Sequence, residues 1–399
     1  MREWLPYRIK DIAQLISIKS EDLTLPYIAL DNIISWDATF VPSDSTTDGN
    51  SNLCEAGDVL FGKLRPYLAK AYIPSETSIC SPEFLVLRPN ESTNNRFLLY
   101  FLLSKSFISH IRNQVAGVKM PRTNWSQISC YPILMPTPDE QEAIAEYLDK
   151  ECEKIGRNID LLERKADAYK RLRRSIINRA VTRGLNPDAP LKPSGIDWVG
   201  DIPEHWNISR FANYFSEHSI SNKGINHQNL LSLSFGNIVR KNIDTCDGLL
   251  PASFETYQIV EPGNIILRFT DLQNDHRSLR VGLVKEEGII TSAYTCVVGN
   301  NETIPEFSFY LLHSYDIKKV FYKLGGGMRQ TLNYKTTKDM GVVMPPLDEQ
   351  KEIVAYLDEK CGKIDAIIEK IGTQIERLKE LKRSLINEVV TGKRVIINV

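Results

Sequence analysis

The sequence predicts an α+β protein in which two mixed α/β domains are separated by a long antiparallel two-helix coiled coil, with a pseudo-twofold internal repeat. The main observation is a duplicated segment. It runs from Asp139 to Thr182 and recurs 209 positions later, from Asp348 to Thr391, without a gap. Self-similarity at a fixed offset marks a repeated structural unit, and this offset is too long for a solenoid. The segments before the two copies also resemble each other weakly, which extends the repeat to the domains.

Each copy of the repeat has the pattern of a long amphipathic helix. In the second copy, apolar residues follow one another at steps of three and four, the spacing of a coiled-coil seam. These residues are Ile353, Leu357, Ile364, Ile367, Ile371, Leu378, Leu381 and Leu385. The first copy keeps the same register through Ile144, Leu148, Ile155, Leu162, Tyr169, Leu172 and Ile176. Charged residues fill most positions between them, as a solvated helix face requires.

We expect the two copies to pair as one intramolecular antiparallel coiled coil. The first copy starts acidic and ends basic, which suits both the helix dipole and an antiparallel partner. Antiparallel pairing sets Asn158 opposite Gln374, a polar pair that would fix the register. The alternatives are a splayed seam with both residues exposed, and two independent helices on separate domains. Thr137, Pro138 and Glu140 form a capping box at the start of the first helix.

The remaining segments are predicted to be two copies of one scaffold. Short strand-like runs, bounded by turn-forming residues, fill residues 1–137 and 207–345. Their framework residues repeat, as Gly57-Asp58-Val59 does in Gly263-Asn264-Ile265, whereas the loops between them differ. The predicted boundaries are a first domain at 1–137, a first spacer helix at 138–185, a linker rich in proline and glycine at 186–206, a second domain at 207–345 and a second spacer helix at 346–399.

The composition is ordinary for a soluble protein. The 399 residues carry a net charge of −1, so any contact with nucleic acid needs locally gathered positive charge or a partner subunit. Seven cysteines without close pairs or metal-ligand spacing favour a reducing cytoplasm. Because neither a signal peptide nor a membrane-spanning run is visible, we expect a cytoplasmic protein that has no membrane partner.

Motifs for catalysis are missing from the sequence. There is neither an Asn/Asp-Pro-Pro-Tyr/Phe signature of amino-group methyltransferases nor a Gly-x-x-x-x-Gly-Lys-Ser/Thr phosphate loop. The six histidines show no ligand spacing, and Gly325-Gly326-Gly327 has the pattern of a turn rather than of a cofactor cradle. We therefore expect a non-catalytic protein with no cofactor or metal of its own. The alternatives are a structural spacer with two protein-binding end domains and an enzyme with an unrecognised site.

The helix motifs resemble those of a known family. The helices open with Asp-Glu-Gln followed by Tyr-Leu-Asp and end with Arg-Ser-x-Ile-Asn and Val-Thr, and the linker contains Lys192-Pro193-Ser194-Gly195. These motifs resemble the conserved regions of type I restriction-modification specificity subunits, over essentially the whole chain. The resemblance implies two target-recognition domains for the halves of a split, asymmetric double-stranded DNA sequence. It also implies docking of two methyltransferase (M) subunits, which bind S-adenosylmethionine, and of restriction (R) subunits.

Candidate DNA contacts follow from residue type, because Arg and Lys suit phosphates and guanines whereas Asn and Gln suit adenines. In the first domain they lie in two loops, with Lys63, Arg65 and Tyr67 in one and Lys119, Arg122 and Asn124 in the other. The equivalent loops of the second domain hold Arg268, Gln273, Asn274, His276, Arg277 and Arg280, and then Arg329, Gln330, Asn333 and Lys335. Ordinary exposed charges are the alternative for each. The outer helix faces and the Asp-Glu-Gln openings are candidates for partner docking, with helix capping as the alternative for the openings.

Overall fold

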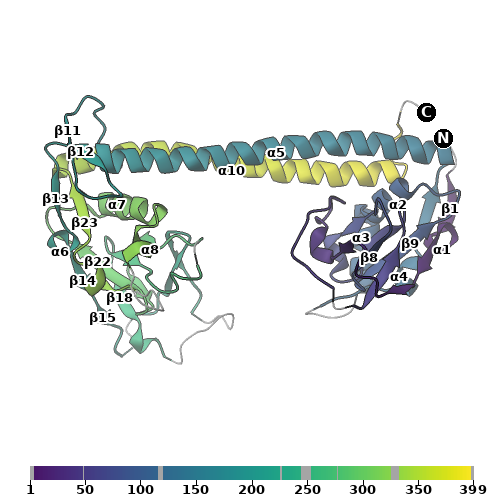
Figure 1. Ribbon diagram of the computed structural model, residues 1–399, viewed down its shortest axis with the longest axis horizontal. Coiled ribbons are helices and arrows are strands. Elements are labelled where there is room, and N and C mark those ends of the chain that lie inside the picture. Colours follow the sequence, from purple (N-terminus) through teal and green to yellow (C-terminus); the bar gives the residue numbers. More distant parts are fainter. Residues whose placement is uncertain are drawn as a thin grey trace. The chain divides into compact units, whose positions relative to one another are not determined.

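The structure, a computed structural model, describes residues 4–47, 49–115, 120–224, 227–243, 253–275, 277–324 and 332–396. The chain divides into two compact units, which Figure 1 traces in sequence colours. Unit 1 comprises residues 1–164 and 371–399, and unit 2 comprises residues 165–370. Each unit therefore combines one sheet-containing domain with a part of each of the two long helices.

The domain of unit 1 is built on two four-stranded sheets. Its strands are β1 (Leu5–Arg8), β2 (Ala13–Ile16), β3 (Lys19–Ser20), β4 (Tyr27–Ile28), β5 (Ser51–Cys54), β6 (Val59–Gly62), β7 (Ala71–Tyr72), β8 (Ser78–Cys80), β9 (Phe84–Pro89) and β10 (Pro132–Met135). The sheet orders are β2-β9-β6-β7 and β3-β5-β8-β4, and β1 pairs separately with β10. The helical elements are α1 (Ile9–Ile12), η1 (Leu30–Asn32), η2 (Pro66–Leu68), α2 (Asn95–Leu102), α3 (Lys105–Gln114) and α4 (Trp125–Ser129). The core lies between α2, α3 and the first sheet, where Phe97 and Phe107 are buried with Phe61.

The domain of unit 2 contains more strands. They are β11 (Leu191–Pro193), β12 (Asp201–Pro203), β13 (Asn207–Arg210), β14 (Phe215–His218), β15 (Ile220–Ser221), β16 (Leu231–Ser234), β17 (Asn237–Arg240), β18 (Gln258–Val260), β19 (Ile265–Leu267), β20 (Val281–Leu283), β21 (Gly288–Ile290), β22 (Thr295–Gly299) and β23 (Gly341–Met344). The helical elements are α6 (Phe211–Tyr214), η3 (Phe254–Thr256), α7 (Pro305–Ile317), α8 (Val320–Leu324) and α9 (Tyr334–Thr337).

Both domains share one topology, which confirms the predicted internal repeat. The sheet β14-β22-β19-β20 matches β2-β9-β6-β7, β15-β18-β21 matches β3-β5-β8, and β13-β23 matches β1-β10. In chain order, α7 and α9 of unit 2 follow the strands as α2 and α4 do in unit 1. The β16-β17 hairpin is an addition in unit 2 among the described residues. The frameworks therefore repeat while the connections differ, as the sequence predicted.

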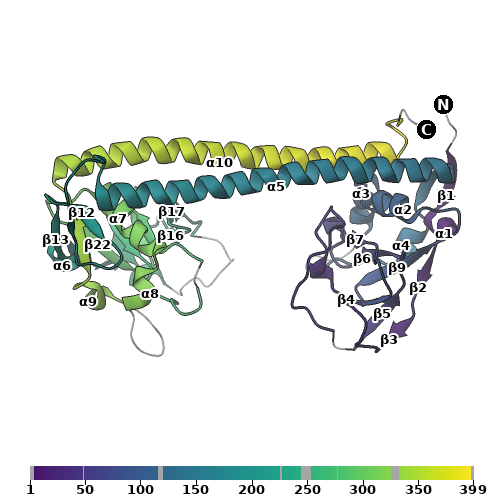
Figure 2. The ribbon, with the colours of Figure 1, turned by 45° about the horizontal axis from the view of Figure 1, so that its top comes forward.

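Two long helices, α5 (Pro138–Arg183) and α10 (Leu347–Val390), pair antiparallel in each unit. Ile144 near the start of α5 is buried in the same apolar cluster of unit 1 as Leu385 near the end of α10. In unit 2, Ile177 near the end of α5 shares a cluster with Ile353 near the start of α10. Figures 1 and 2 show the two helices side by side. The second helix ends at Val390, before the predicted boundary at 399.

Parts of the predicted seam remain open. Leu172 and Leu381, predicted to lie in the seam, are 48% and 53% exposed. Asn158 and Gln374 line one shallow groove of unit 1, but both side chains are exposed, so they do not form a buried polar pair. A pair of helices covers only one side of each helix, and apolar residues that point away from the contact stay in solvent.

The predicted linker at 186–206 is part of the core of unit 2. β11 and β12 form a small antiparallel hairpin, and Ile196, Ile202 and Trp206 are buried in the main apolar cluster. Glu349 at the start of α10 accepts hydrogen bonds from the Trp206 indole (3.0 Å) and the His205 ring (2.7 Å). The segment therefore folds against both helices rather than simply connecting two domains.

Identical residues of the repeat attach the helices to the domains in the same way. The buried Gln141 amide donates to the carbonyls of Pro136 (3.0 Å) and Ser92 (3.1 Å), and its oxygen accepts from the Asn94 N–H (2.8 Å). Gln350 repeats these three bonds in unit 2 at 2.9, 2.8 and 2.8 Å. The glutamine of each Asp-Glu-Gln opening is thus used within the chain.

Two further residue pairs follow the repeat. The Tyr100 hydroxyl donates to Asp149 of α5 (2.6 Å), and the Tyr310 hydroxyl donates to Asp358 of α10 (2.7 Å). The capping prediction at the start of α5 is also confirmed, because the Glu140 N–H donates to the Thr137 hydroxyl (3.4 Å). Within the described residues, no helix is apolar over a length that would cross a bilayer.

Candidate nucleic-acid interface

The two loops predicted to carry DNA contacts in the first domain lie against each other. The first follows β6, and the second precedes α4. The Thr123 N–H donates to the Lys63 carbonyl (3.0 Å), and the Arg65 N–H donates to the Pro121 carbonyl (2.8 Å). Backbone hydrogen bonds therefore hold together two segments that are far apart in the sequence, and the predicted residues on them share one surface.

Side chains on this surface are positively charged and partly exposed. Arg65 and Tyr67 are exposed, whereas Lys63 is half-buried. Arg122 is exposed and pairs with Glu83 at 3.1 Å, a contact that raises the pKa of the guanidinium. Lys119 lies outside the described residues. The connection between β6 and β7 thus offers an arginine and an aromatic ring, both suited to phosphates and bases.

Arg65 has an unusual backbone conformation. Its φ angle is 49°, in the left-handed region that residues with a side chain seldom adopt. Together with Ala69, at φ 48°, it brackets the short η2 turn that carries Tyr67. A conformation of this kind costs roughly 1–3 kcal/mol and is concentrated at functional sites. The loop is therefore held in a defined shape by its surroundings.

The second domain joins its two loops at the equivalent place. The Leu332 N–H lies 3.5 Å from the Phe269 carbonyl, as Thr123 meets Lys63 in the first domain. Arg268 starts the loop and pairs loosely with Asp275 at 3.5 Å. Gln273, Asn274, Arg277 and Lys335 are exposed. The predicted contacts His276, Arg329 and Gln330 lie outside the described residues.

Arg280 is not on this surface, which corrects the prediction that it contacts DNA. Its side chain is completely buried. The guanidinium donates to the carbonyls of Thr270 (2.7 Å), Asp271 (3.0 Å) and Asp275 (2.5 Å) and to the Tyr322 hydroxyl (2.8 Å). With its donors directed at the loop backbone and at Tyr322, Arg280 shapes the loop from beneath and has no group left for a ligand.

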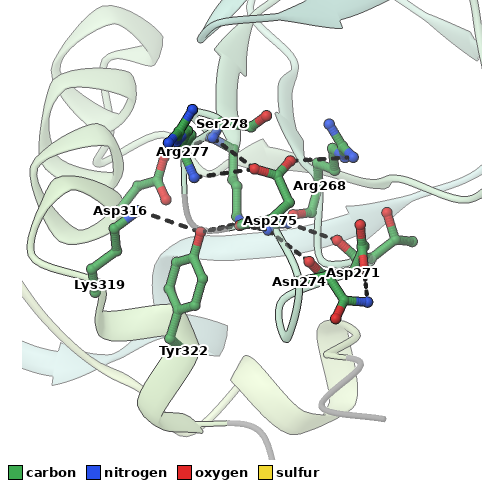
Figure 3. Close-up of polar contacts among 11 residues, drawn as sticks. Arg268, Asp271, Asn274, Asp275, Arg277, Ser278, Asp316, Lys319 and Tyr322 are labelled. Carbon is green, nitrogen blue, oxygen red and sulfur yellow. Dashed lines mark hydrogen bonds and ion pairs between the residues drawn. The ribbon is translucent and has the colours of Figure 1, made fainter. Parts of the chain in front are cut away.

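Carboxylates complete this buried cluster. Asp316 of α7 accepts a hydrogen bond from the Arg280 N–H (2.6 Å), and burial raises the pKa of Asp316 to about 6. Asp275 accepts from the N–H groups of Ser278 (2.9 Å) and Arg277 (3.1 Å), contacts that lower its pKa to about 2. Figure 3 shows the Tyr322 hydroxyl directed toward Asp275 of the loop. Asp275, Asp316 and Tyr322 were missed in the sequence because nothing local marks them.

Asn124 and Asn333 have a structural role that the sequence did not predict. Each caps a short helix. The Asn124 carbonyl oxygen accepts from the Gln127 N–H (3.1 Å), and Asn333 accepts from the Thr336 N–H (3.0 Å). Their amide oxygens are therefore engaged at the ends of α4 and α9, so neither residue can use both amide atoms to pair with adenine without giving up its cap.

Phe235 is a further candidate contact that the sequence analysis missed. It occupies the tip of the β16-β17 hairpin, is 74% exposed and has a φ angle of 47°. The next residue, Gly236, packs so closely on the 268–280 loop that a Cβ there would lie 3.2 Å from Leu279. The Phe235 ring is thus held beside the 268–280 loop. The Phe-Gly turn between two alternating apolar runs was the available signal.

Comparison with known proteins identifies the family. Residues 1–165 and 280–377, more than half of the chain, match the family model described as the type I restriction modification DNA specificity domain. The chain is 23% identical over 320 residues to the type I restriction enzyme MjaVIII specificity subunit of Methanocaldococcus jannaschii, covering 76% of this chain and 71% of that protein. It is 23% identical over 350 residues to the EcoBI specificity subunit of Escherichia coli, covering 80% and 70%.

A solved structure shows the same fold. The chain aligns over 99% of its length with 99% of a chain from a structure of the assembly and conformational transition of the type I R-M system. The TM-score is 0.71 at 17% sequence identity. Among the described residues, no group of histidine, cysteine or carboxylate side chains has the arrangement of a metal site.

Proposed function

The chain belongs to the family of type I restriction-modification DNA specificity subunits, and on that premise we propose that each of its two domains reads one half of a split, asymmetric DNA target. One observation carries the proposal. The same pair of loops is joined at equivalent backbone positions in both domains, at Lys63 and Thr123 in one and at Phe269 and Leu332 in the other. A repeated scaffold with different side chains on its loops suits two readers of different sequences.

In the first domain, we propose that Arg65, Tyr67 and Arg122 contact DNA, with Lys63 in support. An arginine fork matches the O6 and N7 acceptors of guanine and also phosphate oxygens, and a tyrosine ring contacts bases or sugar. Arg65, Tyr67 and Arg122 are exposed, and within the described residues neither Arg65 nor Tyr67 is paired with a carboxylate, which supports this role. Lys119, in the adjoining loop, is a further proposed contact.

In the second domain, the proposed contacts are Arg268, Gln273, Asn274, Arg277 and Lys335, together with Arg329 and Gln330. We add Phe235, because an exposed ring next to the loop can stack on or wedge against a base step. Arg280 is proposed as a positioning residue, since its guanidinium fixes the loop that carries Gln273 and Arg277. Asn333 and its equivalent Asn124 contact DNA in this proposal only through the exposed amide nitrogen.

The paired helices are proposed to set the spacing between the two half-sites. Helix α5 is continuous over 46 residues. At 1.5 Å per residue it is about 69 Å long, roughly two turns of B-DNA at about 34 Å each. A continuous helix pair keeps a constant length, whereas a flexible connection of the same number of residues does not. A constant spacer between two half-sites follows from this stiffness.

Two M subunits are proposed to dock on equivalent apolar patches of the helices. Leu172 of unit 2 and Leu381 of unit 1 occupy the same position in the repeat, and both are about half exposed, at 48% and 53%. Leu381 lies in a shallow groove with Leu161, Leu162 and Leu378. An exposed apolar patch on a soluble protein marks an interaction surface. In this proposal the chain is non-catalytic and cytoplasmic, S-adenosylmethionine is bound by the M subunits, and R subunits join the M subunits and this chain.

Methylation mapping tests the function. The chain would be expressed with its M subunit in a host without other DNA methylation, and methylated bases would be mapped across the genome. We expect one motif of two short parts at constant separation. A spacer protein with protein-binding ends predicts no motif, and an enzyme predicts methyl transfer by the chain alone, so a purified chain without M subunit is assayed in parallel.

A further inference from the structure

A polar pocket lies in unit 2 at the end of α5, away from the loops described above. It has a volume of about 640 Å³ and is lined by the last turns of α5, by the segment that follows to Val199, and by Lys318 after α7. Figure 1 shows β11, β12 and α7 gathered at this end of α5. The volume falls in the range of small-molecule sites, roughly 300–1,000 Å³. Three separate segments of unit 2 thus line one open pocket.

The pocket is lined by three cations, of which Arg179 and Arg183 are exposed, and the Glu349 carboxylate lies beside the lining residue Gly184. Arg179, Arg183 and Lys318 all line the cavity, and no carboxylate does. Among the ion pairs of the described residues, none involves Arg179 or Arg183. The Lys318 ammonium donates to the Trp198 carbonyl (2.7 Å). Burial and the nearby charge of Arg183 lower the pKa of Lys318, so the cations are close enough to repel one another.

Helix dipoles do not account for three cations at this place. The carboxyl ends of α5 and α7 each carry roughly half a negative charge, about −1 in total, against three positive side chains. The repeat provides an internal comparison. Glu388 of α10 and Gly392, which follows α10, are the repeat equivalents of Arg179 and Arg183 of α5, 209 positions earlier. Because α10 reaches Val390 without these arginines, the helix end does not require them.

Uncharged donors share the same wall of the cavity. Ser175 and Asn178 line it on α5, about two turns and about one turn before Arg183 respectively, and Asn186 lines it after the helix. The Asn178 side-chain amide oxygen already accepts from the Ser314 hydroxyl (3.0 Å), which leaves the side-chain amide nitrogen as the atom able to donate to a ligand. Guanidinium forks with neighbouring amide and hydroxyl donors are the set that suits phosphate oxygens.

We propose that this pocket binds a phosphate-bearing anion, through Arg179 and Arg183 with Lys318 as a point charge. The phosphate belongs either to a free nucleotide or to the backbone of bound DNA, and both sources present the same oxygens. The site is separate from the loops proposed to read DNA bases. Its occupancy would add a ligand-dependent contact at the junction of α5 and the folded linker.

Titration calorimetry on the full chain at fixed ionic strength tests the proposal, with pyrophosphate and ATP as probes. We expect saturable binding by the unmodified chain and a loss of about ten-fold or more in affinity for Arg179→Glu, which introduces the residue of the other repeat. Arg183→Gln is the second variant and should weaken binding in the same direction. Circular dichroism melts check that both variants fold.

Arg171→Glu is the matched control, because Arg171 is exposed on the same helix, does not line the cavity and gives the same charge change. The affinity of this variant for pyrophosphate should stay within about two-fold of that of the unmodified chain. A loss equal to that of Arg179→Glu would mean that the net charge of the chain, and not the pocket, determines binding. Duplex binding distinguishes the sources. If the pocket binds a DNA phosphate, Arg179→Glu should weaken binding to every duplex alike, and pyrophosphate should compete with duplex DNA. If the pocket binds a nucleotide, Arg179→Glu should leave duplex affinity unchanged. Absence of saturable binding by either probe, with unchanged duplex affinity, overturns the proposal.

Discussion

The guanidinium of Arg280 donates a 2.8 Å hydrogen bond to the hydroxyl of Tyr322, and its carbon lies 5.0 Å from the centre of that ring. The same hydroxyl donates to the carbonyl of Asp275 at 2.9 Å. Through these bonds the 268–280 loop is attached to α8, and Figure 3 shows the contact between Tyr322 and Asp275. The shape of one proposed DNA-reading loop therefore depends on residues that never reach its surface.

Replacing Arg280 with methionine should destabilise unit 2. The loop carbonyls that the guanidinium contacts would be left without donors, and breaking a buried charged network costs about 3–5 kcal/mol. Scanning calorimetry should show a lower melting temperature for the transition of unit 2. Arg277→Met is the control, since Arg277 is exposed in the same loop and a surface change costs no more than about 0.5 kcal/mol. Equal destabilisation by both changes would contradict the positioning role.

The proposed base contacts should act on one half-site each. Arg65→Ala is expected to weaken binding to a duplex with the intact target sequence by about 1–3 kcal/mol. It should also relax the sequence preference, at the first half-site only. Arg277→Ala should do the same at the second half-site. Competition binding with duplexes mutated in either half measures both effects. Arg157→Ala, on the exposed face of α5 where Arg157 pairs with Glu153 (2.9 Å), serves as the control. Loss of preference at both half-sites from one change would argue against separate readers.

Gln141→Ala and Gln350→Ala should have matching effects in their own units. Each change removes the three hydrogen bonds of a buried side chain and leaves backbone groups unsatisfied, so we expect a loss of about 2–3 kcal/mol. Urea unfolding followed by tryptophan fluorescence and calorimetry measures the change. Gln374→Ala, an exposed glutamine on α10, should change stability little. Clearly unequal losses at the two equivalent positions would mean that the shared sequence does not reflect a shared attachment.

Acid should weaken unit 2 through His313. This ring is buried on α7, and its Nδ1 has no partner within the described residues. Burial, with the charges of Arg173 and Arg174, lowers its pKa from 6.5 to about 4. Because the unfolded chain takes up the proton first, stability is full above pH 6.5 and falls toward pH 4, by about 3 kcal/mol in total. His313→Phe should flatten this decline in urea midpoints measured across the range.

Asp316 should act in the opposite direction over an overlapping range. Burial raises its pKa from 3.8 to about 6, so the folded chain takes up this proton first. Its contribution to stability therefore increases as the pH falls from about 6 to about 3.8 and is lost as the pH rises again. Asp316→Asn keeps an oxygen for the Arg280 N–H and should make the acid decline steeper. If both variants changed the slope in the same direction, the assignment of the two groups would be wrong.

The fold was predictable because its signals are local and occur twice. The three-and-four spacing of Ile353, Leu357 and Ile364 identifies α10 without knowledge of its partner, and the repeat then indicates the partner. The antiparallel pairing of Ile144 with the region of Leu385 followed from charge order. What the pattern did not show is which seam positions a second helix covers, since periodicity gives a face but not the width of the contact.

The candidate site was less predictable, because residue type does not determine burial. Arg280 and Arg277 lie three positions apart in one loop, yet one is completely buried and the other exposed. Arg280 rather than Arg277 is buried because it contacts Tyr322 and Asp316, which lie about 40 positions further along the chain. In the linker, by contrast, the apolar residues Ile202 and Trp206 indicated burial, but the high proline content of the segment led to the prediction of a simple connection. Residue type selected both loops of each domain as candidates. That the two loops of a domain contact each other became visible only in the structure.

Leu172 and Leu381 give a final prediction, because a twofold repeat should offer two equal docking patches. Leu381→Asp and Leu172→Asp each place a charge in one exposed apolar patch, which disfavours burial against a partner. We expect each change alone to reduce the number of bound M subunits from two to one, and the double change to abolish binding, as measured by native mass spectrometry. Leu134→Asp is the control, since Leu134 is 47% exposed on β10 rather than on the helices. Two M subunits bound to the double variant would place the docking surface elsewhere.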